Sequence, residues 1–258
     1  MTINKIAKMS HEERAQRRDI KRAEVLKIAR RMGWINTAAA AVLLDVTRPA
    51  AVRTLKGLTA DGFLYSHELH GMPKRLWYSI SETGMEEAFF LEDMPLSASI
   101  QTGRWKIAPQ NYQHEQDVLI FAIQAQKAGA DIRLPEPQGN NGRAKAGKYP
   151  DLLVEINEHV FGIEIEREAK SQRRYKDIIA SHWLAMEREQ YDGVLYLTPD
   201  QATRDRVGRV VKSVFDRVRI GGRERALSEP ERQKFLFGKY VQGITFIKKY
   251  GGKNDDKD

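Results

Sequence analysis

The segment that decides the fold of the C-terminal half is 151-DLLVEINEHVFGIEIE-166. Apolar residues recur at every second position on both sides of Asn157 and Glu158, which is typical of two antiparallel strands joined by a two-residue turn. With that turn, Asp151 lies directly opposite Glu164. One face of the hairpin then carries the apolar side chains of Leu152, Val154, Ile156, Phe161, Ile163 and Ile165.

The other face of this hairpin gathers carboxylates, those of Asp151, Glu155, Glu164 and Glu166. Cross-strand partners have Cβ atoms about 5 Å apart, so like charges at these positions repel each other. Burying such a cluster costs free energy unless a cation lies between its members. Because Mg²⁺ and Mn²⁺ prefer carboxylate oxygens, this face is a candidate divalent-metal site. The alternative is a strand side that faces solvent.

Composition limits the classes of protein to consider. The chain has 258 residues, enough for two modest domains, and is 41% hydrophobic and 30% charged. It contains no cysteine, which excludes disulfides and thiolate zinc sites and predicts a cytoplasmic location. No apolar run reaches the roughly 18 residues of a membrane span, and no signal peptide is recognisable, so membrane insertion is not expected.

The net charge of +8 favours a polyanionic partner, most often nucleic acid. A merely basic protein is the alternative.

The first part of the chain, residues 1–92, has the order of a winged helix. A polar, basic stretch (residues 1–19), predicted as a short helix or flexible arm, precedes a helix over 19–32 that ends at Gly33. The next helix covers 37–44. Thr47 then caps a third helix that has Pro49 in its first turn and ends at Gly62. Two strands, 63–69 and 75–80, and a helix over 81–90 complete the domain.

Cationic and polar side chains make this domain a candidate DNA-binding domain. They are Arg48, Arg53, Thr54 and Lys56 on the third helix and Lys74 and Arg75 at the tip of the wing. Long donors on a helix reach phosphates and base edges in the major groove, and a basic wing reaches the neighbouring backbone. Winged helices also mediate protein–protein contacts, and in that case these cations form a solvated face.

The second part, residues 93–250, alternates helices and strands after a connection over 91–111. We expect a helix over 111–127, a strand at 132–134, a Pro/Gly/Asn-rich loop over 135–149 and then the acidic hairpin. A helix over 170–189, a strand over 193–197 and a helix over 199–217 follow. Residues 251–258 form a tail that we expect to be disordered.

This order of helix, strand hairpin, helix and strand, with an Asp followed by Glu-x-Glu, resembles the PD-(D/E)xK nuclease superfamily. The resemblance implies a restriction-endonuclease-like domain, with a mixed central sheet flanked by helices, that binds Mg²⁺ or Mn²⁺. Carried over, it makes Asp151 and Glu164 metal ligands and Glu115 an additional acidic ligand from the preceding helix. Glu166 stands where most members have lysine, and Lys170 would supply the missing cation. The metal would lower the pKa of a bound water and stabilise charge on the phosphate.

A narrower resemblance rests on the segments YQHEQDVLI, PDLLVEINEHVFGIEIERE, KSQRRYKDII and VLYLTP behind a winged helix. Together they resemble the replication-relaxation group, and especially the MobC-type mobilisation relaxases of plasmids. The resemblance implies an endonuclease that recognises an origin of transfer in double-stranded DNA and nicks one strand. Its implied partners are a relaxosome accessory protein and a coupling protein. Scission would take place at Glu115, Asp151, Glu164 and Glu166, and Arg173 and Arg174 of the basic run would contact DNA.

Two attacking groups are compatible with this resemblance. One is a metal-activated water; the other is Tyr175, which would form a phosphotyrosine link. Tyr175 alternatively packs on the apolar face of its helix or contacts a phosphate.

Other functions remain compatible with the sequence. They are a non-catalytic replication or transcription regulator, a relaxosome accessory protein, an inactivated nuclease fold and a restriction or transposon-end nuclease that makes double-strand breaks. The histidines form no metal-spaced set, and neither a Walker loop nor a nucleophile elbow is present.

Overall fold

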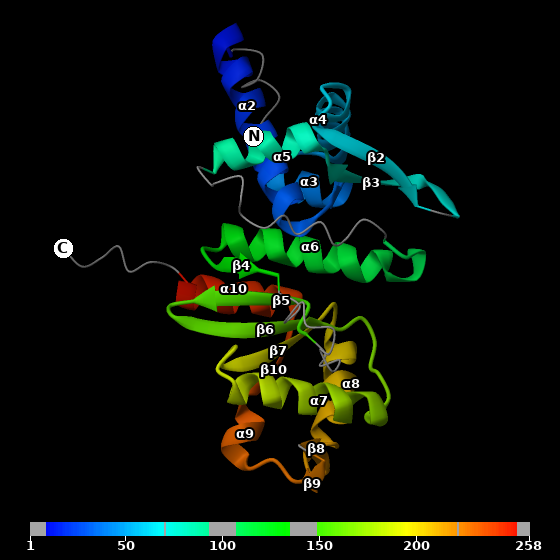
Figure 1. Ribbon diagram of the computed structural model, residues 1–258, viewed down its shortest axis with the longest axis vertical. Helices are drawn as coiled ribbons and strands as arrows, with labels where there is room; N and C mark the ends of the chain where they lie inside the picture. The colour runs from blue at the N-terminus through cyan, green and yellow to red at the C-terminus, as the bar shows by residue number, and fades with distance from the viewer. Residues whose placement is uncertain (1–8, 70, 93–106, 135–148, 221, 252–258) are drawn as a thin grey trace, which may run out of the picture. The chain divides into compact units, whose positions relative to one another are not determined.

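The computed structural model describes residues 9–69, 71–92, 107–134, 149–220 and 222–251, with the backbone alone for 72–75. The chain divides into two compact units, Met1–Ile123 and Gln124–Asp258 (Figure 1). The division lies within a helix, whereas the sequence placed it between residues 92 and 93. Most of the expected loop over 135–149, and residues 252–258 of the expected tail, lie outside the described residues.

The N-terminal unit has the predicted order of helix, helix-turn-helix and β-hairpin. Its elements are α2 (His11–Met32), β1 (Ile35–Asn36), α3 (Thr37–Leu44), α4 (Arg48–Ala60), β2 (Leu64–Leu69), β3 (Met72–Ile80) and α5 (Glu82–Leu91). The three strands form an antiparallel sheet in the order β1-β3-β2. The core contains Trp34, Tyr78, Phe89, Leu26 and Leu55, each at most 2% exposed.

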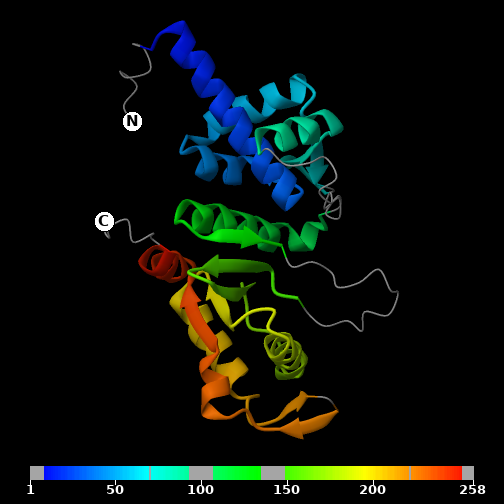
Figure 2. The ribbon, with the colours of Figure 1, turned by 60° about the vertical axis from the view of Figure 1, so that its left-hand side comes forward.

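The long helix α2, blue in Figure 2, begins earlier than the sequence suggested. Ser10 and Glu13 form a reciprocal capping box, so residues 11–19 are the first turns of this helix rather than a separate arm. The helix ends at Gly33, whose φ of 77° is readily adopted only by glycine. Thr47 occupies the predicted N-cap of α4, but its side chain makes no capping hydrogen bond.

Asn36 explains why the N-terminal unit extends beyond α5. Its side chain caps α3 by accepting from the Ala39 amide at 2.9 Å. The same side chain donates to Tyr112 Oη and Gln116 Oε1, both at 2.9 Å. These partners lie on α6 (Tyr112–Lys127), which follows the short 3-10 helix η1 (Pro109–Asn111). The start of α6 therefore belongs to the N-terminal unit.

The C-terminal unit is built on a five-stranded mixed sheet in the order β10-β7-β6-β5-β4. The strands are β4 (Asp131–Arg133), β5 (Leu152–Ile156), β6 (His159–Ile165), β7 (Gly193–Thr198) and β10 (Phe235–Lys239). β4, β5 and β6 pair antiparallel, whereas β6–β7 and β7–β10 pair parallel. The result is the mixed α and β architecture expected from the sequence.

The register of the β5–β6 hairpin confirms the predicted turn. Ile156 pairs with His159 and Leu152 with Ile163, so Asn157 and Glu158 form the two-residue turn. Both turn residues have positive φ, 46° and 68°, as a type I′ turn requires. The Asp151 amide donates to the Ile163 carbonyl at 2.8 Å, which brings Asp151 next to Glu164.

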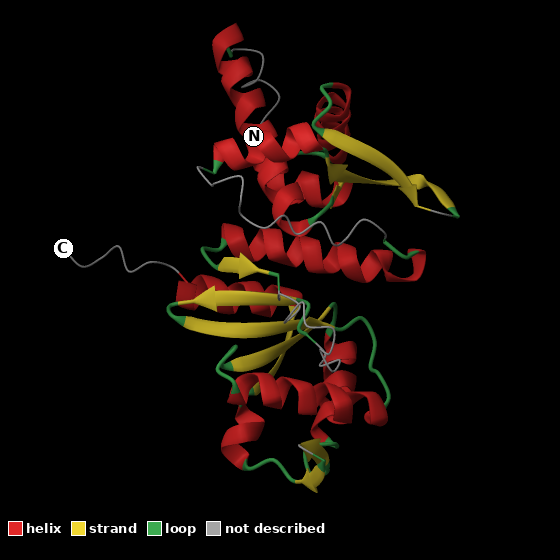
Figure 3. Ribbon diagram, viewed as in Figure 1, coloured by secondary structure: helices red, strands yellow, loops and turns green. Residues whose placement is uncertain are grey.

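Helices lie on both faces of this sheet (Figures 1 and 3). α7 (Gln172–Glu187) and α8 (Gln201–Lys212) lie against the face that carries Val194 and Tyr196, and build a core with them. α10 (Tyr240–Gly251) lies against the other face, where Phe246 meets Phe161 edge to face. The carboxylate face of β6 is therefore covered by α7 and does not face solvent.

The end of the chain contains elements that the sequence did not predict. The helix expected over 199–217 ends at Lys212 and is followed by the hairpin β8 (Val218–Ile220) and β9 (Arg223–Arg225), by α9 (Glu229–Gln233), and by β10 and α10. Within the described part of the chain, no helix is both long enough and apolar enough to span a bilayer.

Candidate functional site

The predicted carboxylates of the C-terminal unit come together at β6. Glu164 is 1% and Glu166 is 2% exposed, although both are charged residues of a type that is almost never fully buried without a partner. Asp151, at the start of β5, is half-buried, and its Oδ2 accepts a hydrogen bond from the Ile165 amide at 2.8 Å. Asp151 precedes β5, Glu164 lies in β6 and Glu166 follows it, whereas Glu155, the fourth carboxylate of the predicted cluster, pairs with Arg133.

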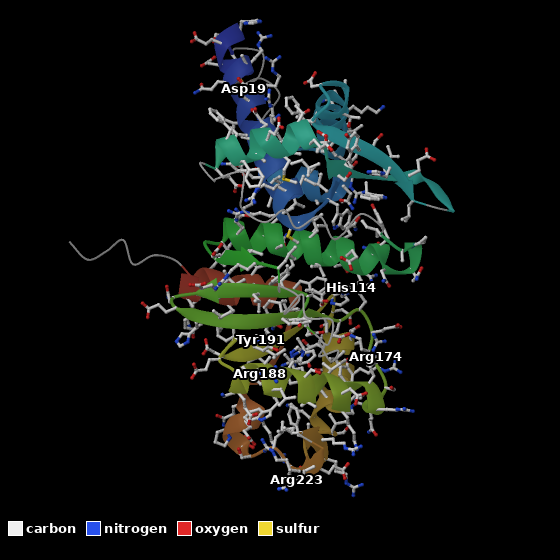
Figure 4. The ribbon with its side chains drawn as sticks, in the orientation of Figure 1. Asp19, His114, Arg174, Arg188, Tyr191 and Arg223 are labelled. Atoms are coloured by element: carbon white, nitrogen blue, oxygen red, sulfur yellow. The ribbon has the colours of Figure 1, made fainter. Side chains whose placement is uncertain are left out.

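Glu164 meets a histidine that the sequence reasoning did not select. His182 of α7 is 0% exposed, and its Nε2 lies 3.2 Å from Glu164 Oε1. The contact has the distance of an ion pair without the direction of a hydrogen bond. His182 Nδ1 lies 2.7 Å from the hydroxyl of Tyr191, which precedes β7 (Figure 4). A buried chain of carboxylate, imidazole and phenol therefore runs from the sheet to α7.

Two further tyrosines surround these carboxylates. Tyr196 is in register with Glu164 on the neighbouring strand, and its ring makes an edge contact with that of Tyr175. Burial, followed by the negative charges of Glu164 and Glu166, raises the pKa of Tyr196 well above its ordinary value. Burial also raises the pKa of Tyr175 and of Tyr191, with nearby glutamates adding to the effect. The three phenols are thus held neutral beside buried carboxylates.

Glu166 contacts the predicted cation. Lys170 Nζ contacts Glu166 Oε2, and the ammonium group also lies 5.9 Å from the ring centroid of Tyr175. The backbone amide of Lys170 donates to the Tyr175 hydroxyl at 3.4 Å. Tyr175 itself is 0% exposed. Its burial and raised pKa favour the packing role over the role of attacking nucleophile.

The three carboxylates meet only part of what a Mg²⁺ or Mn²⁺ site requires. Asp151, Glu164 and Glu166 offer the hard oxygens that these ions take. Among the residues that the structure describes, however, no three His, Asp or Glu side chains gather closely enough to share one ion. Glu164 faces His182 and Glu166 faces Lys170. As arranged, these carboxylates do not form a ready metal cage.

Glu115 lies in the first turn of α6, within the N-terminal unit, and is half-buried. The carboxylates of β6 belong to the other unit. The predicted position of Glu115 beside the carboxylates of β6 therefore stays a prediction.

The winged helix presents most of the predicted DNA-binding side chains at its surface. Arg48, Arg53 and Lys56 of α4 are exposed. Thr54 is half-buried, and its hydroxyl donates to the Ala50 carbonyl at 3.2 Å, so this hydroxyl forms a hydrogen bond within its own helix. The side chains of Lys74 and Arg75 lie outside the described residues.

A cation on α2 adds to the surface of α4. The pKa of Lys21 is lowered by burial and then by the positive charges of Arg17 and Arg53. Lys21 therefore lies near Arg53 of α4, an addition that the sequence did not predict. The basic first half of α2 was the available signal.

Arg173 and Arg174, the last two predicted DNA contacts, are exposed in the first turn of α7 (Figure 4). The residues of the buried cluster that the sequence did not predict are His182, Tyr191 and Tyr196. The available signal was a histidine seven residues after Tyr175, on the apolar face of a helix that follows an acidic strand.

Comparisons with known proteins show a single weak likeness at this point. No protein-family model matches the chain, and no curated protein matches it. A solved structure, a mutant of MepR from a multidrug-resistant S. aureus clinical isolate, aligns at 13% identity with a TM-score of 0.27, covering 48% of this chain and 97% of that one. At this TM-score the likeness carries no argument about fold or function.

The Glu164–His182 pair predicts a measurable coupling energy. Replacing His182 with alanine leaves a buried carboxylate without its imidazole and should lower the free energy of unfolding by about 3–5 kcal/mol. In a separate cycle, the double variant Glu164→Gln/His182→Gln should lose less stability than the sum of the losses in Glu164→Gln and His182→Gln, measured by chemical denaturation. Strictly additive losses would show that the two side chains do not interact.

The buried tyrosines should ionise at a higher pH than exposed tyrosines do. An exposed phenol ionises near pH 10, roughly. Because the folded-state pKa of Tyr175, Tyr191 and Tyr196 is raised, their contribution to stability is complete below that pH and is lost as pH rises above it. Absorbance titration of the phenolate band should show these tyrosines ionising together with unfolding. A Tyr196→Phe variant should show a smaller late step, whereas unchanged amplitude would contradict the assignment.

Proposed function

We propose that this chain is a DNA-binding protein that contacts duplex DNA through its winged helix. The observation that carries the proposal is the exposure of Arg48, Arg53 and Lys56 on α4, the second helix of the helix-turn-helix. Arg53 and Lys56 are three residues apart and hence neighbours on the helix surface. A helix in this position enters the major groove with donors toward phosphates and base edges.

The electrostatics of the N-terminal unit support this proposal. Lys21 of α2 adds positive charge near Arg53, and the charges of Arg17 and Arg53 add to burial in lowering the pKa of Lys21. Like charges held close together repel each other, and phosphates placed between them would relieve that repulsion. The net charge of +8 adds long-range attraction to a polyanion.

The variant Arg53→Gln/Lys56→Gln should bind duplex DNA more weakly. Each lost phosphate contact lowers the slope of log affinity against log salt by about 0.9. Fluorescence anisotropy with a mixed-sequence duplex over a range of salt concentrations measures both quantities.

The matched control is Lys248→Gln/Lys249→Gln, which removes equal charge from exposed positions on α10. If both variants weaken binding equally, net charge rather than α4 is responsible.

A second, more specific candidate is a MobC-like relaxase that nicks one strand at an origin of transfer with Mg²⁺ or Mn²⁺. It is favoured by the placement of Asp151 opposite Glu164, and of Lys170 against Glu166, on a mixed sheet flanked by helices. Because the carboxylates as arranged do not form a metal cage, this candidate requires Glu164 and Glu166 to turn from His182 and Lys170 toward a shared ion, which would then supply an activated water. The candidate partners are an accessory protein and a coupling protein. The non-catalytic alternatives, a replication or transcription regulator or an accessory protein, need only the winged helix.

The nicking candidate is tested with supercoiled plasmid carrying the cognate origin, incubated with Mg²⁺ or Mn²⁺ and, separately, with a chelator. The expected result is open-circular product that depends on metal and is lost in Asp151→Asn and Glu164→Gln. The matched control is Glu158→Gln, a change at an exposed carboxylate in the turn of the same hairpin.

Binding without any nick would leave the regulator or accessory function. Linear product instead of open circles would favour a restriction-type nuclease.

A further inference from the structure

The hairpin β8–β9 and the residue that precedes it carry a concentration of arginines for which the winged helix gives no role. Residues 217–225 contain Arg217, Arg219, Arg223 and Arg225 against one acidic residue, Glu224. The first three are exposed, and we call them the hairpin arginines. Arg223 lies at the end of the C-terminal unit drawn lowest in Figure 4.

The base of the hairpin is fixed by the core of the unit. Val218 is 0% exposed, and the Leu227 amide donates to the Phe215 carbonyl at 2.8 Å. Arg225 forms a two-pronged contact with Glu231 at 2.7 and 2.9 Å, and its guanidinium lies 5.2 Å from the ring centroid of Trp183. This fourth arginine is therefore structural.

The acidic residues near the hairpin are already engaged by other cations. Arg232 donates to Asp216 at 2.5 Å, and Lys176 lies 3.4 Å from Glu224. Over the part of the chain that the structure describes, the hairpin arginines form no ion pair, and Arg219 makes a single contact at 3.4 Å to the Gly222 carbonyl. Among the described residues, no carboxylate therefore forms an ion pair with these three guanidinium groups.

The strand register places these arginines on both faces of a narrow ribbon. Arg219 pairs with Glu224 and Ile220 pairs with Arg223, so Arg219 and Arg223 project to opposite sides. A two-stranded ribbon is narrow enough to lie in the major groove, whose walls are the two phosphate backbones. The guanidinium fork matches phosphate oxygens better than an ammonium group does.

The surface continues onto α7. Gln172 donates to Ser213 at 3.1 Å, which joins the first turn of α7 to the residue that follows α8. Arg173 and Arg174 are exposed in that turn. Cations on a ribbon and on an adjoining helix give several donors to a polyanion within one unit.

We propose that the hairpin arginines form a second DNA contact, which binds the phosphates of duplex DNA independently of the winged helix. This inference rests on the proposed DNA-binding function and extends it to the C-terminal unit. The contact reads no sequence, because phosphates carry none. Its effect is to add affinity and salt sensitivity to binding.

The test compares two triple variants of the full chain that lose the same charge. Arg217→Gln/Arg219→Gln/Arg223→Gln removes the hairpin arginines. Arg188→Gln/Lys248→Gln/Lys249→Gln removes three exposed cations elsewhere in the same unit. With a mixed-sequence duplex, the first variant should reduce the salt slope by about 2–3, at about 0.9 per contact. The second should leave it nearly unchanged. Thermal unfolding of both variants checks that each is folded.

A DNA-cutting reagent attached to the protein locates the contact directly, without a comparison of affinities. The chain has no cysteine, so Arg223→Cys introduces a single thiol. An iron chelate attached there should cut bound duplex DNA, whereas the same reagent at Lys249→Cys should cut much less.

The outcomes separate the inference from the proposed function. If the intact chain binds no duplex DNA, both fail. If it binds, but the two triple variants have equal salt slopes and the reagent at position 223 cuts no more than the one at 249, only the hairpin contact is overturned. Retention on vesicles containing phosphatidylserine that requires the hairpin arginines, with an unchanged DNA salt slope, would overturn it in favour of a lipid surface.

Discussion

The burial of the Glu164 carboxylate is the constraint on which the C-terminal unit depends. A charge taken out of water costs several kcal/mol, roughly, unless neighbouring groups compensate it. Here α7 covers the strand face and places His182 Nε2 3.2 Å from Glu164 Oε1, so the helix brings a polar group to the buried carboxylate. The apolar residues that hold α7 on the sheet therefore also hold the imidazole in position. Packing and electrostatics at this site cannot be changed separately.

The sequence predicted the hairpin well and the surroundings of its carboxylates poorly. Alternation around Asn157 and Glu158 is a local signal, and the observed register follows it. Helical periodicity places His182 on the apolar face of α7, but it does not say which residue of the sheet that face will contact. β10 was missed for a related reason: its strand signal is limited to Phe235 and Phe237, Gly238 and Lys239 weaken it, and its place depends on parallel pairing with β7.

The N-terminal unit shows the same division between local and tertiary signals. The order of its elements follows from helix caps, Gly33 and the alternating strands, all readable from neighbouring residues. The position of α6 cannot be read from neighbouring residues, because it depends on hydrogen bonds from Asn36 to Tyr112 and Gln116, which are far away in the sequence. Likewise, the contribution of Lys21 to the α4 surface becomes visible only when α2 is packed.

The carboxylate cluster is graded in exposure from a fully buried end to a half-buried end. Its deep end is the fully buried His182 beside Tyr191. Its open end is the start of β5 and the end of β6, where Asp151 is half-buried and Lys170 precedes the exposed first turn of α7. Asp151 and Lys170 are therefore the partly exposed members of this cluster, whereas α7 covers Glu164. The same helix that buries Glu164 thus links the end of β6 to the exposed first turn of α7.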